Sequence, residues 1–274
     1  MSHINIANPV GLAAGFDKDY IMSSSLATLG FGYIVGGTVV LRQRAGNPKP
    51  RLVRDRLSGS LTNSLGFPSQ GLERIVSNLK STVDKKTKFI TSISGLSIEE
   101  FLTCYSQLQP LSAGIELNIS SPNTEGIRVF QQIDHLKELL ASLNGMKTKP
   151  LFIKLSPYFN QEEKDHSLRI IDLCLEHSID GLTLSNTRPV TDGRLAVGKG
   201  GLSGKPLINH TLRIVKEIRS NYSQDITINA CGGISSGDNA LELIAAGADT
   251  IQLYTGFIYE GPSIAKKIND HILL

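Results

Sequence analysis

Eight short β-rich runs alternate with segments of helical periodicity along the whole of this 274-residue chain. The β-rich runs are residues 10–16, 33–40, 88–94, 113–120, 151–156, 181–186, 226–232 and 250–256. Strands that alternate with helices form parallel sheets, and eight such units in roughly 250 residues are typical of a closed barrel. We therefore predict an α/β fold, a (β/α)₈ TIM barrel, as a single domain over residues 1–274. A doubly wound open sheet is the alternative, because alternation alone does not distinguish a closed sheet from an open one.

Helical segments are predicted between these strands, and one further segment fits neither pattern. The predicted helices are residues 71–83, 97–109, 130–145, 161–177, 209–222, 237–246 and 261–273. Residues 41–70 form the one long irregular stretch, rich in Arg, Gly, Pro and Asn. Because long irregular segments of a compact domain are usually functional, we expect this stretch to contribute to a site.

The composition indicates an ordinary soluble globular protein, with 40% hydrophobic and 19% charged residues. The net charge of +3 is small and spread along the chain, so it gives no basis for binding nucleic acid. Cys104, Cys174 and Cys231 lie far apart without metal-ligand spacing, which favours a reducing, cytoplasmic location. No apolar run reaches the ~20 residues of a membrane span, and the first residues lack a signal-peptide pattern, so we expect no membrane insertion.

Asparagines follow several predicted strands, at the barrel end where active sites lie. They are Asn118, Asn123 and Asn186, together with Asn63 in the irregular stretch. Each alone is more simply explained by an Asx-turn or a helix cap. Four that converge on one barrel mouth favour a binding site, because amide side chains offer both donors and acceptors to a flat, neutral ring such as a pyrimidine.

Two other features indicate a cofactor. Lys154, within the apolar run LFIKLS, would be buried on a central strand, where lysines are rare unless paired. A salt bridge to a barrel carboxylate is one explanation; a charge beside N1 and O2 of a flavin is the one we favour. The glycine-rich turn at 232–233 and the Tyr254-Thr255-Gly256 run follow the last two strands, where barrels bind phosphate, although glycines also serve ordinary tight turns.

Nine sequence motifs, taken together, resemble those of the dihydroorotate dehydrogenase family. They are NPVGLAAGFDK (8–18), GNPKPR (46–51), NSLGF (63–67), NISSPNT (118–124), IKLSP (153–157), SNT (185–187), GGLSGKP (200–206), GGISSG (232–237) and QLYTGFIYEGP (252–262). The resemblance runs in register from about residue 8 to 262. It implies an FMN-dependent barrel that oxidises (S)-dihydroorotate to orotate in de novo pyrimidine (UMP) biosynthesis.

The resemblance also implies roles for individual residues. The flavin positions are Ala13, Ala14, Gly15, Lys18, Gly37, Thr38, Ser92, Asn118, Lys154, Ser185, Gly204, Gly232, Gly233, Tyr254 and Thr255. The substrate positions are Lys18, Asn63, Leu65, Gly66, Phe67, Asn118, Asn123, Asn186 and Thr187.

The catalytic positions implied by the resemblance are Ser121, Thr124 and Lys18. Dihydroorotate would lose its C5 proton to Ser121 and a hydride from C6 to N5 of the flavin. Because a serine is a weak base, Thr124 and an ordered water would relay the proton in a closed site. Lys18, with backbone N–H groups nearby, would bind the 6-carboxylate.

The base position bears on the subclass of the enzyme. Soluble members of the family usually have cysteine there, whereas membrane-associated members have serine and an N-terminal helical extension. This chain has Ser121 but begins almost directly at its first predicted strand. We therefore expect a soluble enzyme, and a homodimer as in soluble relatives. The oxidant stays open among fumarate, NAD through a flavin/iron–sulfur partner subunit, another soluble acceptor and a quinone, with a quinone from a membrane the least expected.

Two other functions stay open at this point. An FMN barrel acting on another reduced pyrimidine, such as dihydrouracil, would use the same asparagines but would need no cation for a 6-carboxylate. A non-catalytic flavin-binding barrel that serves as an assembly subunit is the second alternative. Reduction of the bound flavin by dihydroorotate, and not by dihydrouracil, distinguishes the three.

Overall fold

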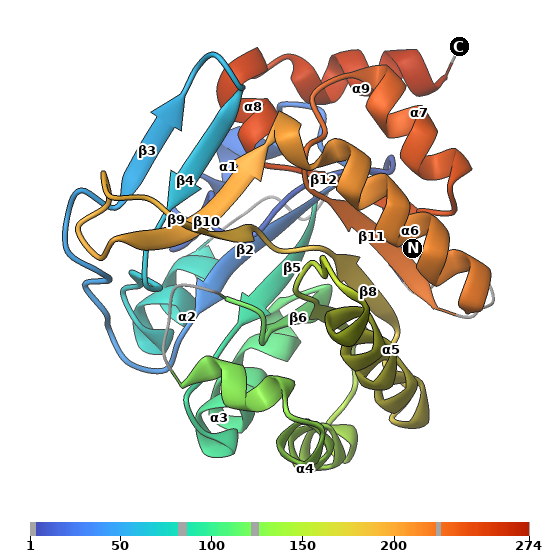
Figure 1. Ribbon diagram of the computed structural model, residues 1–274. Coiled ribbons are helices and arrows are strands. Elements are labelled where there is room, and N and C mark those ends of the chain that lie inside the picture. The colour runs from blue at the N-terminus through green and yellow to red at the C-terminus, as the bar shows by residue number, and fades with distance from the viewer. Residues whose placement is uncertain (1–3, 82–86, 122–125, 223–225, 274) are drawn as a thin grey trace.

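The computed structural model describes residues 4–81, 87–121, 126–222 and 226–273, and in them eight parallel strands close into a barrel (Figure 1). The barrel strands are β1 (Val10–Leu12), β2 (Tyr33–Val39), β5 (Lys88–Ile93), β6 (Gly114–Asn118), β7 (Leu151–Lys154), β8 (Gly181–Leu184), β11 (Thr227–Cys231) and β12 (Thr250–Leu253). β1 pairs in parallel with both β2 and β12, which closes the sheet. The predicted (β/α)₈ barrel is confirmed, and the open-sheet alternative is wrong.

Helices cover the outside of the barrel (Figure 1). The α-helices are α1 (Ser23–Ala27), α2 (Leu72–Ser81), α3 (Ile98–Leu108), α4 (Ile133–Asn144), α5 (Gln161–Glu176), α6 (Ile208–Asn221), α7 (Gly237–Ala245), α8 (Thr255–Glu260) and α9 (Ile264–Ile272). Three short 3₁₀ segments are Gln109–Leu111, Ile127–Gln131 and Lys205–Leu207. The predicted helices correspond to α2–α7 and α9, whereas α1 and α8 were not predicted, because elements of five and six residues are too short to show a helical period.

The barrel strands end earlier than the sequence indicates. β1 ends at Leu12, where the prediction runs to residue 16, and β12 ends at Leu253, where it runs to residue 256. After β1 the chain turns through Gly15, whose φ of +101° is a conformation that favours glycine. The residues beyond each strand end therefore belong to the barrel mouth and not to the sheet.

The stretch 41–70 is not irregular throughout, which corrects the prediction. It contains a hairpin of β3 (Leu52–Asp55) and β4 (Ser60–Asn63). The hairpin joins β10 (Lys199–Gly204) and β9 (Arg188–Thr191) in an antiparallel sheet of order β3-β4-β10-β9 beside the barrel (Figure 1).

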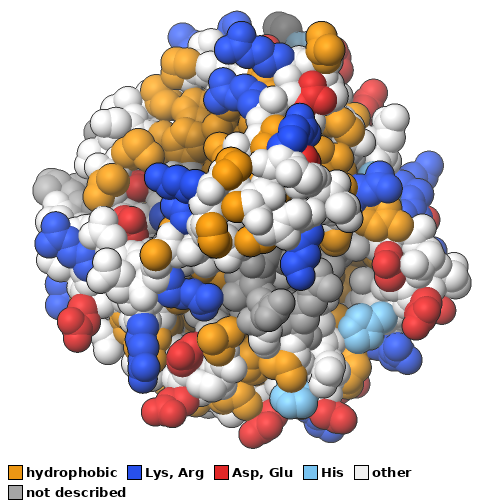
Figure 2. Space-filling model, turned by 60° about the vertical axis from the view of Figure 1, so that its left-hand side comes forward, with side chains coloured by type: hydrophobic (Ala, Val, Ile, Leu, Met, Phe, Trp, Pro, Cys, Tyr) orange, Lys and Arg blue, Asp and Glu red, His pale blue; other side chains and the backbone are white. Residues whose placement is uncertain are grey.

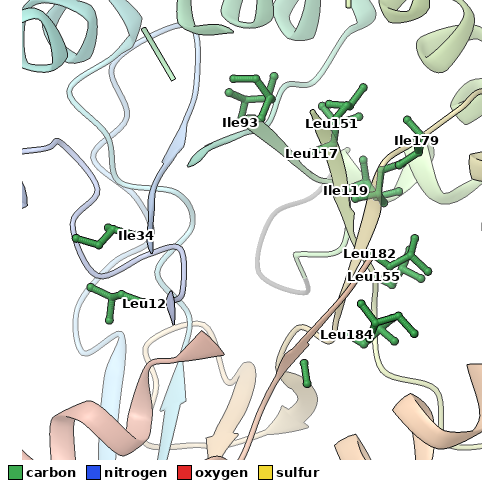
Figure 3. Packing of buried hydrophobic residues seen from close by; sticks show 14 of the residues in the cluster. Leu12, Ile34, Ile93, Leu117, Ile119, Leu151, Leu155, Ile179, Leu182 and Leu184 are labelled. Carbon is green, nitrogen blue, oxygen red and sulfur yellow. The ribbon is translucent and has the colours of Figure 1, made fainter. Parts of the chain in front are cut away.

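Side chains of the barrel strands alternate between two environments. Outward-facing side chains are apolar and pack beneath the helices; Leu117, Leu182 and Leu184 are among those shown in Figure 3. Inward-facing side chains near the amino ends of the strands form a smaller apolar cluster that includes Tyr33 and Phe152. This cluster fills the bottom of the barrel and leaves the carboxyl ends of the strands for polar residues.

The face that carries the small sheet shows acidic and basic side chains interspersed, with hydrophobic side chains gathered toward the upper left (Figure 2). Among the described residues, no helix combines the length and the apolar character needed to cross a bilayer.

Truncation of the outward-facing core tests this packing. Leu117 is fully buried on β6, so Leu117→Ala should lower the free energy of unfolding by about 2–5 kcal/mol through lost contacts and an unfilled cavity. Leu57, fully exposed after β3, is the matched control, and Leu57→Ala should change stability by no more than about 0.5 kcal/mol. Equal urea midpoints for the two variants would contradict the outward packing.

Candidate active site

A cavity opens at the carboxyl ends of the barrel strands, bordered by the small sheet. About 1060 Å³ of space lies within it, a figure that includes space open to solvent. Its lining combines residues that follow the barrel strands with residues of β3, β4 and β10. The barrel and the small antiparallel sheet therefore form a single site together.

Most of the residues that the sequence assigns to a flavin or a pyrimidine line this cavity. They are Ala13, Ala14, Gly15, Lys18, Thr38, Asn63, Leu65, Gly66, Phe67, Asn118, Ser121, Lys154, Ser185, Asn186, Thr187, Gly204, Gly232, Gly233, Tyr254 and Thr255. Asn123 and Thr124 lie outside the described residues. The structure therefore brings residues far apart in the sequence to one place.

Gly37 and Ser92 are not part of the lining. The carbonyl of Gly37 accepts a hydrogen bond from the backbone N–H of Gly15 (2.7 Å), and a Cβ at Gly37 would lie 2.5 Å from the carbonyl oxygen of Ser92. The Ser92 hydroxyl is fully buried and lies 3.1 Å from that of Thr38. Both residues thus support the wall of the cavity from behind.

Asn118, at the end of β6, is the centre of a network of amide and hydroxyl groups. Its Nδ2 donates to the hydroxyl of Thr38 (3.0 Å), and its Oδ1 accepts from Nδ2 of Asn186 (3.4 Å). Nδ2 of Asn186 also donates to the Ser120 hydroxyl (3.0 Å). Oδ1 of Asn186 also accepts from the backbone N–H of the next residue, Thr187 (2.8 Å), so the side chain is held locally while it faces the cavity.

Lys154 ends β7 and is buried in the barrel interior, with 5% of its surface exposed. Its Nζ lies 3.8 Å from Sγ of Cys231 on β11. Burial by itself lowers the pKa of Lys154, but Cys231 and Glu116 raise it by more, so the net shift is upward and the ammonium stays charged at neutral pH. The strand thus presents a fixed positive charge to the cavity.

Lys18 provides a second cation, nearer the mouth and partly exposed. Burial is the largest influence and lowers its pKa from 10.5 to about 8; Asp19 opposes this shift and Arg51 adds to it. The preceding residue, Asp17, accepts from the backbone N–H of Ile21 (3.0 Å) and from the Ser23 hydroxyl (2.7 Å), which fixes the turn that holds Lys18.

The segment after β4 enters the cavity under backbone strain. Phe67 lines the cavity with a φ of +52°, a conformation uncommon for a bulky side chain. At the neighbouring Gly66, φ is +69° and a Cβ would lie 2.5 Å from Oδ1 of Asn47. Such strain persists where the surrounding structure holds it, and it is common at ligand sites.

Two glycines of the cavity lining, Gly204 and Gly233, lie so close to neighbouring backbone atoms that a side chain would not fit at either position. Gly233, between β11 and α7, has a φ of +85°, and a Cβ there would lie 2.3 Å from the backbone nitrogen of Ile208. Gly204, at the end of β10, would place a Cβ 2.3 Å from the carbonyl oxygen of Gly59. The Ser203 and Thr255 hydroxyls lie 2.8 Å apart beside this glycine wall.

Several lining residues were given no role in the sequence analysis. They are Leu52, Leu61, Ser203, Leu207, Cys231, Ile234 and Gln252. Leu52, Leu61 and Ser203 come from the small sheet, which the sequence did not predict. Gln252 could have been found from its spacing, since it lies two residues before Tyr254 and residues at that spacing share one face of a strand.

Comparison with known proteins places this geometry in context. A family model described as dihydroorotate dehydrogenase matches residues 1–273. The "dihydroorotate dehydrogenase (quinone)" of Coxiella burnetii (strain Dugway 5J108-111) is 38% identical, covering 99% of this chain and 83% of that protein. The protein of the same name from Bordetella avium (strain 197N) is 36% identical, covering 95% and 80%. A crystal structure of DHODH from Eimeria tenella in complex with ferulenol has a TM-score of 0.88 and 29% identity, covering 98% and 83%.

Proposed function

Because this chain belongs to the dihydroorotate dehydrogenase family and is an oxidoreductase, we propose that it holds FMN and dihydroorotate together in the cavity, with Ser121 as the catalytic base. The observation that carries the proposal is the convergence of Lys18, Lys154, Asn118 and Ser121 on that cavity. Members of this family use a flavin; FMN and the residue roles are the parts that we propose.

The residues of the cavity fit FMN. Gln252 is 1% exposed and lines the cavity. Within the described residues its side-chain amide makes no well-formed hydrogen bond; the Tyr33 hydroxyl lies near it, but the short hydrogen bond of that hydroxyl is with Thr250 (2.7 Å). A buried amide whose hydrogen bonding is incomplete costs about 1–3 kcal/mol, and the polar edge of a flavin ring would complete it. Gly204 and Gly233 line the cavity, and backbone N–H groups of such glycine turns after the last strands would bind the phosphate, as in other barrels.

When bound, FMN would accept at its N5 the hydride that leaves C6 of dihydroorotate. Lys154 would lie beside the pyrimidine edge of the flavin, where its charge favours the reduced ring. Asn63, Asn118 and Asn186 would hold the substrate ring through its amide edges. Restricting the ring to one orientation supplies a large part of the rate enhancement.

Ser121 would take the proton from C5 of dihydroorotate. It is 7% exposed and lines the cavity three residues after Asn118. Because a serine hydroxyl is a weak base, it needs exclusion of water and a proton relay. Thr124, the relay indicated by the sequence, lies outside the described residues and stays a prediction.

Lys18 would bind the 6-carboxylate, the group that distinguishes dihydroorotate from dihydrouracil. Its ammonium lines the cavity near the mouth, and a charge-assisted hydrogen bond to a carboxylate is worth about 1.5–3 kcal/mol. Arg51, close enough to lower the pKa of Lys18, adds positive potential on the same side.

We further propose a quinone as the oxidant. The curated relatives from Coxiella burnetii and Bordetella avium are named for a quinone. The sequence left the oxidant open and favoured a soluble one only because of where the chain begins. The homodimer, the electron-transfer partner subunit and the cytoplasmic location stay predictions.

Replacement of Ser121 tests the base assignment. Ser121→Ala should lower turnover by about 10²–10⁴-fold, the usual contribution of a positioned base, while flavin absorbance per protein stays unchanged. Ser121→Cys should retain turnover, since the base position of soluble relatives carries cysteine. Wild-type turnover in Ser121→Ala at neutral pH would contradict the assignment.

The titration of Lys18 predicts how substrate binding depends on pH. Below about pH 8 Lys18 is an ammonium and binds the carboxylate; above that pH it loses its charge. The KM for dihydroorotate should therefore rise by roughly tenfold between about pH 7 and pH 9 as the ion pair is lost. Lys18→Arg keeps its charge and should show no such rise. A wild-type KM that stays constant across this range would rule out Lys18 as the carboxylate ligand.

A further inference from the structure

Three charged side chains are buried among the described residues: Asp17, Glu116 and Lys154. The carboxylate of Asp17 is bonded locally to backbone N–H groups and a serine hydroxyl outside the barrel. Glu116 and Lys154 lie on adjacent strands, β6 and β7, and both are inside the barrel. A buried charge is costly unless an opposite charge lies near it, so these two residues need to be considered as a pair.

The position of Glu116 follows from the strand register. Asn118 is the neighbour of Lys154 across β6 and β7, and Glu116 lies two residues before Asn118 on the same inward face. Glu116 Oε2 accepts a hydrogen bond from the hydroxyl of Thr183 (2.7 Å) on β8. Thr183 is the neighbour of Lys154 on the other side of β7. The hydrogen bond from β8 to β6 therefore crosses the inner face of β7 next to Lys154.

Because the Glu116 carboxylate is buried, water screens its charge only weakly, so the charge acts on Lys154. Glu116 is 0% exposed, and in the part of the chain that the structure describes its second oxygen, Oε1, has no hydrogen-bond partner. Among the described residues the other titratable groups near it are Tyr33 and Cys231, and burial is the largest influence on both and raises the pKa of each. In a dry interior the interaction between two charges is screened far less than in water.

We propose that Glu116 is a positioning residue that acts through Lys154 to lower the midpoint potential of the bound flavin. This inference rests on the proposed function. An isolated Lys154 ammonium would favour the reduced flavin, because two-electron reduction adds negative charge near N1. The carboxylate one layer below offsets part of that positive charge, so reduction by the substrate becomes less favourable and electron transfer to the oxidant more favourable.

Neutralisation of Glu116 tests the proposal. Glu116→Gln keeps the shape and the acceptor for Thr183 but removes the charge. In the flavin-loaded protein, it should raise the equilibrium constant for two-electron reduction by about tenfold or more, equivalent to about 30 mV. The measurement is an anaerobic reductive titration beside a redox dye of known potential. Glu116→Asp, which keeps the charge, should remain close to wild type.

Two further variants complete the test. Glu138→Gln removes an exposed carboxylate on α4 and should leave the potential unchanged. Thr183→Val removes the hydrogen bond that holds Glu116 Oε2 next to Lys154, so the carboxylate offsets less of the Lys154 charge and the potential should rise as well. If Glu116→Gln does not fold, the potential of Thr183→Val tests the role of Glu116 in its place.

The outcomes separate this inference from the proposed function. A wild-type potential in flavin-loaded Glu116→Gln, or in Thr183→Val when Glu116→Gln does not fold, would overturn the role of Glu116. An equal shift in Glu138→Gln would also overturn it. A wild-type protein that takes up no flavin would instead overturn the proposed function.

Discussion

The pairing of β1 with both β2 and β12 is the constraint on which the site depends. β1 has only three residues, and Gly11 at its centre is in register with Tyr33 on one side and Gln252 on the other. A Cβ at Gly11 would lie 2.3 Å from the Tyr33 ring, so a larger residue there would displace that ring. Because β1 closes the barrel, the segment that carries Lys18 lies across the cavity lining from Lys154 on β7.

The two lysines of the cavity differ in electrostatics in a way that suits different ligands. Lys154 is held in the interior next to Glu116 and keeps its charge, which suits a cofactor that is bound throughout turnover. Lys18 is partly exposed and has a pKa of about 8, which suits a substrate that enters and leaves. The amide network around Asn118 lies beside them and is rigid through its bonds to Thr38 and Asn186. The deeper lysine, Lys154, thus keeps its charge at neutral pH, whereas Lys18, nearer the mouth, loses its charge above about pH 8.

The barrel could be predicted from the sequence because its signal is a repeat, eight alternations of strand and helix. The positions of Asn118, Asn186 and Lys154 followed from the rule that strand ends converge. The small sheet could not be predicted, because Pro189 interrupts β9 and three glycines weaken β10, so their pairing and not their local preference forms the strands. The identity of the groups around Lys154 was also hidden: the sequence analysis allowed for a barrel carboxylate, but Glu116 and Thr183 are brought beside Lys154 only by the register of β6, β7 and β8, and Cys231 only by the closure of the barrel.

Anaerobic mixing of the flavin-loaded protein with dihydroorotate tests the central claim most directly, since the cavity is proposed to hold both molecules in contact. Dihydroorotate should rapidly bleach the visible absorbance of the flavin, whereas dihydrouracil, which lacks the carboxylate that Lys18 would bind, should not. Bleaching that a quinone then reverses faster than fumarate would support the proposed oxidant. A flavin that stays oxidised with dihydroorotate, or that dihydrouracil reduces equally fast, would contradict the account.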